Sequence, residues 1–154
     1  MIDYKARIES DIVEYGQFLQ AVLGSPPWTY TIGNADKGLP ELIMCGIDPR
    51  SAMGILNDIG TRMRTGGVPL EPGTFIHEVA NMPMRIDAVH PSWIPELMCQ
   101  SVYREERLGR DGEALRALQI TWPDRAGLFP GEPGHDVGML KAQMDLSKPK
   151  PLDD

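Results

Sequence analysis

The chain has 154 residues, enough to bury one hydrophobic core, so we expect a single domain over residues 1–145 and a flexible tail over 146–154. Its 15 basic and 22 acidic residues give a net charge of −7, which disfavours nucleic acid and anionic membranes as partners. The two cysteines lack metal-binding spacing and predict no thiolate zinc site. The amino terminus is charged and no long apolar run occurs in the sequence, so we expect a cytoplasmic protein.

The first 47 residues contain one helical pattern and three strand patterns. Apolar residues recur at helical spacing before Gly16 and predict an amphipathic helix, with Ile2, Ile8, Ile12 and Val13 on its apolar side. Segments 17–24 and 28–33 are predicted strands, separated by two prolines. Segment 40–47 is an almost continuous apolar run, as in a central strand covered on both faces. Together these segments predict an antiparallel hairpin inside a larger sheet.

A helix is predicted to begin at Asp48-Pro49. The Asp side chain can accept hydrogen bonds from the first helical turn, and proline is tolerated where an N–H would have no partner. Gly66-Gly67 predicts a left-handed end to this helix. Its core-facing stripe consists of Ala52, Ile55, Leu56, Ile59 and Met63.

The second half predicts a further hairpin, a helix and a last strand. Segments 74–80 and 84–89 alternate with the period of two that half-buried strands show. A helix is predicted from Ser92 as its cap, followed by a polar connection over 105–113 and a strand over 114–122. The fold class is therefore α+β: a single domain with a mainly antiparallel bent sheet or split barrel and about three helices.

No motif of metal or nucleophilic catalysis is present. "HEVAN" at 77–81 ends in Asn81 where a zinc-protease helix needs histidine, and its alternation favours a strand. The spacing of His77, His90 and His135 gives no metal pattern, and their roles stay open. Cys45 lies in the most apolar strand, where burial would keep its thiol inert.

Polar residues gather at the end of the last strand. In "LQITWPD", Gln119 and Thr121 share one face of the strand and Trp122 the other. An amide and a hydroxyl on one face either meet water or line a polar cavity. Asp124 follows a Trp-Pro step and either closes an Asx turn over 125–127 or accepts donors from a ligand.

Three blocks of the chain resemble a mainly bacterial family, the domain of unknown function DUF4262. They are "PWTYTIGN", "GLPELIMCGIDPRSAMGILNDIG" and "LQITWPDRAGLFPGEP", and the resemblance extends from about Gly16 to His135. The chain has Gly131 where the family pattern usually carries tryptophan, and Asn34 where it usually carries leucine. A ligand stacked on that tryptophan in relatives would be bound differently here. The resemblance places on family positions Tyr30, Thr31, Gly33, Pro40, Glu41, Leu42, Gly46, Leu56, Asn57, Gln119, Trp122, Pro123, Asp124, Gly127, Phe129 and Pro130.

The leading functional hypothesis is a cytoplasmic module that binds a small polar, nucleotide-like molecule. Tyr30 would stack on the ligand, Gln119 would recognise an amide-like edge and Asp124 would accept donors. The expected ligand-binding residues are Tyr30, Thr31, Gly33, Gln119, Trp122 and Asp124.

Two other functions stay open. The first is a flavin-dependent redox protein of the split-barrel type, which would be a homodimer. This alternative rests on analogy of fold alone. The second is a protein inhibitor of the immunity or anti-defence type, which the small size and acidity would suit. The sequence names no cofactor and no reaction.

Overall fold

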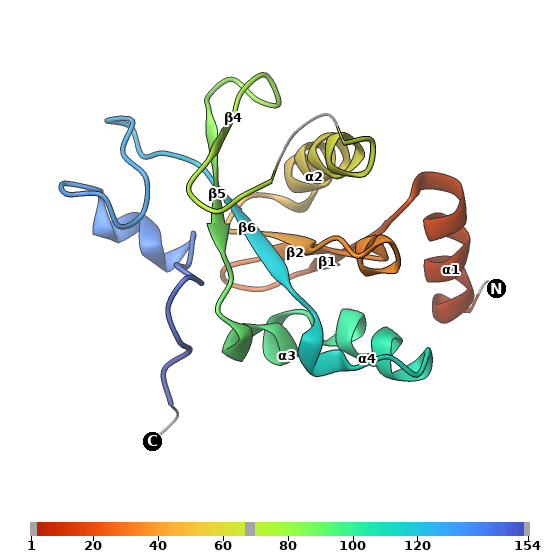
Figure 1. Cartoon of the computed structure of the whole chain (residues 1–154). Helices are drawn as coiled ribbons and strands as arrows, with labels where there is room; N and C mark the ends of the chain where they lie inside the picture. Colours follow the sequence, from red (N-terminus) through yellow and green to blue (C-terminus); the bar gives the residue numbers. More distant parts are fainter. Residues whose placement is uncertain (1–2, 67–69, 153–154) are drawn as a thin grey trace.

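Six strands form one open, twisted sheet in the order β1-β2-β3-β6-β5-β4 (Figure 1). The computed structural model describes residues 3–66 and 70–152. β3 and β6 are parallel neighbours, and the other pairs are antiparallel. The α+β class and the mainly antiparallel sheet are confirmed, and the sheet is not closed into a barrel. The strands are β1 (Phe18–Val22), β2 (Trp28–Ile32), β3 (Glu41–Cys45), β4 (Phe75–Ile76), β5 (Met84–Ala88) and β6 (Ala117–Thr121).

Four α-helices lie around the sheet in the described part of the chain, close to the three expected. They are α1 (Tyr4–Tyr15), α2 (Pro49–Arg64), α3 (Ile94–Leu97) and α4 (Cys99–Arg107), with 3₁₀ turns at Asn34–Lys37, Pro91–Trp93, Gly112–Ala114 and Val137–Lys141. Over residues 3–66 and 70–152, no helix has both the length and the apolar character needed to cross a membrane.

Helix α2 closes one face of the sheet, and it is built as its sequence predicts. The Asp48 carboxylate accepts a hydrogen bond from the N–H of Ser51 at 3.0 Å. Gly66 follows the helix with a φ of 74°, while Gly67 lies outside the described residues. The predicted stripe Ala52, Ile55, Leu56, Ile59 and Met63 is buried and packs in one cluster with Leu42, Met44, Leu118 and Ile120 of the central strands.

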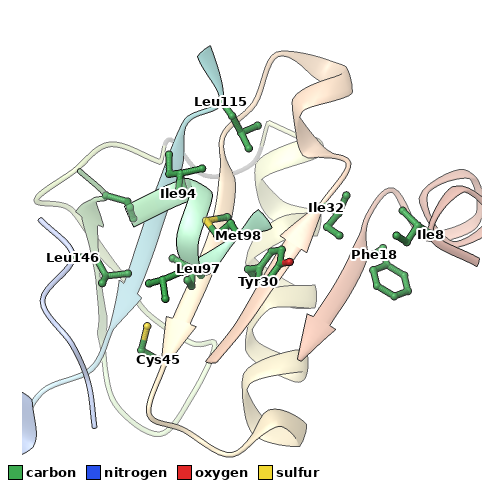
Figure 2. Close-up of a cluster of buried hydrophobic side chains, with 13 residues drawn as sticks. Ile8, Phe18, Tyr30, Ile32, Cys45, Ile94, Leu97, Met98, Leu115 and Leu146 are labelled. Atoms are coloured by element: carbon green, nitrogen blue, oxygen red, sulfur yellow. The ribbon is translucent and has the colours of Figure 1, made fainter. Parts of the chain in front are cut away.

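The opposite face is covered by segments that are far apart in the sequence. Its cluster joins Tyr30 and Cys45 of the sheet to Ile8 of α1, Met98 of the α3–α4 junction and Leu146 near the carboxyl end (Figure 2). Leu146 and Met98 are fully buried. Ile2, predicted for the first helix, lies outside the described residues, and Val13 of α1 is exposed.

Two predicted elements differ from the structure. The strand expected over 74–80 is only Phe75–Ile76, because the backbone bends after it and Glu78 adopts a φ of 70° that no strand contains. The helix expected from Ser92 is divided into α3 and α4 at Met98, whose φ and ψ of −126° and 38° are not helical. Ser92 does not cap it, since the His90 ring accepts the Ser92 N–H at 3.2 Å.

Candidate functional site

A buried carboxylate, Glu41, organises the turn between β2 and β3. Its oxygens accept hydrogen bonds from Thr31 Oγ1 at 2.8 Å and from the N–H groups of Gly33, Asn34 and Ala35 at 3.2, 3.2 and 3.0 Å. The φ of 114° at Gly33 lets these N–H groups turn toward one side chain. Burial raises the pKa of Glu41 to about 7, against the lowering effect of the four donors. The predicted site residues Thr31 and Gly33 thus hold this carboxyl group.

Gln17 connects the Glu41 turn to helix α2. Its Oε1 accepts from Asn34 Nδ2 at 2.9 Å and from Arg64 Nη1 at 2.8 Å. Its Nε2 donates to the Leu56 carbonyl at 3.2 Å and to Asn57 Oδ1 at 3.3 Å. The Asn57 oxygen accepts this bond, while its NH₂ group forms no hydrogen bond within residues 3–66 and 70–152.

An open pocket of about 580 Å³ lies beside β1, between α1 and α2. Among its lining residues, Arg7, Asn57 and Thr61 carry donor groups, and Asp11 carries a carboxylate. Within residues 3–66 and 70–152, the side chains of Arg7 and Asp11 form no ion pair. The lining residues are Arg7, Asp11, Tyr15, Gln17, Phe18, Leu19, Gln20, Ala21, Met53, Asn57 and Thr61.

Tyr30 is buried in β2 and does not present an open ring. Its hydroxyl accepts the N–H of Gln100 at 3.2 Å, and burial raises the pKa of its phenol. The residue borders a smaller pocket of about 300 Å³ together with Tyr4, Gln20 and Cys99. A stacking role for Tyr30 stays a prediction.

Gln119 contacts the chain's own carboxyl-terminal segment. Its Nε2 donates to the Met144 carbonyl at 2.6 Å, and its Oε1 accepts the Leu146 N–H at 3.2 Å. The backbone of Trp122 is held in the same way, since the Gln143 side chain pairs with its N–H and its carbonyl, both at 2.9 Å. A ligand at Gln119 would have to replace these contacts.

Asp124 closes the loop that leaves β6, in the turn role that its sequence indicates. Its carboxylate accepts the N–H groups of Ala126, Leu128 and Asp136, each at 2.9 Å. These backbone donors lower the pKa of Asp124 below its ordinary value. All three bonds lie within the loop, so the side chain has a complete structural role.

The predicted site residues thus fall into separate environments. Tyr30 and Gln119 lie in register on either side of Ile43, with one strand between them. None of the pockets described here has both of them in its lining. Sequence reasoning missed Gln17 and Arg64, whose partners are distant along the chain. The sequence signal for this network was Glu41, at the start of an apolar strand, because a buried carboxylate requires hydrogen-bond partners.

No cluster of three or more histidine, cysteine or acidic side chains suited to a metal ion occurs in residues 3–66 and 70–152. His90 caps a 3₁₀ turn, and His77 lies exposed after β4. His135 is buried in the loop that follows β6, where its Nε2 has no partner among the described residues.

Comparison with known proteins identifies a domain family for this chain. No curated protein and no solved structure matches the chain. The model of a domain family described as a domain of unknown function, DUF4262, matches residues 11–136, which include the end of α1, all six strands and the Asp124 loop. The chain belongs to the DUF4262 family.

Proposed function

We propose that the domain is a cytoplasmic binding module for a small polar molecule of the nucleotide type, which occupies the pocket between α1, β1 and α2. The observation that carries the proposal is the set of donors from two helices around one opening: Arg7, Asn57 and Thr61. Its volume of about 580 Å³ lies within the range of small-molecule sites.

The floor of this pocket is held rigidly. Gln17, which is 2% exposed, forms four hydrogen bonds that fix the orientation of its amide. Asn34 and Arg64 behind it are fixed in turn, since Asn34 binds the Glu41 carboxylate through its N–H. This floor, which is already ordered, would lose little side-chain entropy when a ligand binds.

The charges around the pocket indicate the class of ligand. The guanidinium of Arg7 would pair with a single anionic group, and the carboxylate of Asp11 would accept hydrogen bonds from the donors of a sugar or base. The exposed side chain of Tyr15 also lines the pocket, and a base could stack on its ring. The net charge of −7 disfavours polyanions such as triphosphates. A nucleoside monophosphate fits this description.

Titration of the four common nucleoside monophosphates, followed by NMR of the backbone amides, tests the proposal. We expect shifts at Asn57, Thr61 and Gln20, and a loss of about tenfold in affinity with Arg7→Gln, because one charge-assisted hydrogen bond is removed. Lys5→Gln is the matched control, since Lys5 is an exposed cation on the same helix outside the pocket.

Other results would contradict the proposal. Loss of binding with Gln119→Leu but not with Arg7→Gln would move the site to the strand ends expected from the sequence. A yellow protein that retains flavin would support the redox alternative. A stable complex with one protein, unchanged by Arg7→Gln, would support the inhibitor alternative.

A further inference from the structure

A second cavity, of about 540 Å³, lies on another part of the molecule. This open cavity is lined by residues of the segment from Pro91 to Pro95, of α4 and of the 3₁₀ turn Gly112–Ala114 that precedes β6. None of its residues lines the pocket between α1, β1 and α2. The lining residues are Pro91, Ser92, Ile94, Pro95, Val102, Glu106, Gly112, Glu113 and Leu115.

The walls of this cavity are mainly apolar. Ile94 and Leu115 belong to the core cluster and are 4% and 7% exposed, so they form a firm inner wall (Figure 2). Val102 packs against the same cluster from α4. Two prolines with fixed φ angles, Pro91 and Pro95, also line the cavity. Such a surface favours the apolar body of a ligand.

The charged groups of the cavity are both acidic. Glu106 and Glu113 are exposed, and neither carboxylate forms a hydrogen bond or an ion pair within the described residues. No lysine or arginine is among the lining residues. Arg110, which lies between the two glutamates in sequence, is already paired with Glu105 and Asp36. The rim therefore presents uncompensated negative charge next to an apolar wall.

We propose that this cavity binds a small organic cation with an apolar body, such as a protonated aryl-alkyl amine. The apolar body lies against Ile94, Val102 and Leu115, and the ammonium group lies between Glu106 and Glu113. The net charge of −7 on the chain adds a general attraction for cations. This site shares no lining residue with the nucleotide-type pocket, so the two proposals are tested independently.

Three probes with the same apolar body test the proposal: phenethylammonium, phenethyl alcohol and phenylacetate. Binding is followed by NMR of the backbone amides of the full chain. We expect the cation to shift Val102, Glu106, Gly112, Glu113 and Leu115, with an affinity about tenfold above that of the alcohol. Phenylacetate should bind most weakly. The preference for the cation should shrink as salt is added, because exposed charges are screened.

The double variant Glu106→Gln/Glu113→Gln should reduce the affinity for the cation to that of the alcohol, with the binding of the alcohol unchanged. Glu71→Gln/Glu78→Gln is the matched control, because both residues are exposed glutamates outside the cavity. Val102→Phe, which fills the cavity, should weaken the binding of the cation and of the alcohol to the same extent. Equal affinities for the three probes, shifts confined to other residues, or a cation preference that survives the double glutamine variant would overturn the proposal.

Discussion

The two faces of the sheet are closed in different ways. On one face, a single continuous helix, α2, lays a stripe of apolar side chains on β3 and β6. On the other face, the cover comes from α1, the α3–α4 junction and Leu146, which lie far apart along the chain (Figure 1).

On the second face, a buried amide binds the backbone of the covering segment. Gln119 faces the carboxyl-terminal segment and binds the backbone of Met144 and Leu146 with both ends of its amide. Further along, Lys150 donates its N–H to Ser92 Oγ at 2.8 Å. The comparison shows that a helix, whose backbone groups are largely paired internally, docks mainly through its apolar stripe with a few side-chain hydrogen bonds such as those of Gln17. An irregular segment also needs partners for its backbone groups.

Truncation of a fully buried leucine on each face should show how much each face contributes to stability. We expect Leu56→Ala to lower the free energy of unfolding by about 4 kcal/mol, because α2 leaves only with the whole core. Leu146→Ala should cost about 2 kcal/mol, because the terminal segment can open locally. Urea denaturation measures both values. A larger loss for Leu146→Ala would show that the second face is the more cooperative.

The Glu41 turn should make stability depend on pH. The carboxyl has a pKa of 4.5 when unfolded and about 7 when folded. Between these values the folded chain holds a proton that the unfolded chain has lost, so stability falls as pH rises from 4.5 to 7. The loss is about 3 kcal/mol from the shift in pKa.

Urea denaturation at several pH values measures this effect, and Glu41→Gln is its control. The variant has no titrating group at this position, so its stability should be flatter across the same range. Asp36, Asp48 and Asp124 have lowered pKa values in the folded chain, so the stability that they contribute is lost only below about pH 4. Stability of the native chain that rises between pH 4.5 and 7 would contradict the assignment.

The smallest expected effect concerns the hydrogen bonds on the second face. Gln119→Leu keeps the volume of the side chain but leaves the Met144 carbonyl and the Leu146 N–H without partners. We expect a loss of about 1–2 kcal/mol and faster hydrogen exchange in residues 144–150, with α2 unchanged. Protection that stays the same in this segment would show that apolar contacts alone hold it.

Several elements follow from neighbouring residues and could be predicted. The α2 stripe, its Asp48 cap and the turn closed by Asp124 each depend on residues at most a few positions apart. The apolar run of β3 likewise required burial on both faces, and all five of its residues are buried. The alternation of apolar and polar residues over 74–80 predicted a longer strand than the structure has, because the chain bends out of the sheet after Ile76.

The candidate site was less predictable, because its contacts join distant residues. Tyr30 and Gln119 do lie on buried strands, as their patterns indicate, but the partner of Gln119 is 25 residues away at Met144. Gln17 meets Arg64 across 47 residues. A polar side chain in the sequence shows that a partner is required, without showing which one.

The sequence by itself determined α1, α2, most of the strands and the turn closed by Asp124, because helical period, strand period and capping are properties of consecutive residues. Only the tertiary structure decided that β3 pairs in parallel with β6, that the carboxyl-terminal segment covers Gln119, and that Arg7 and Asn57 share one pocket. These arrangements depend on long-range packing and on the need of each buried polar group for a hydrogen-bond partner.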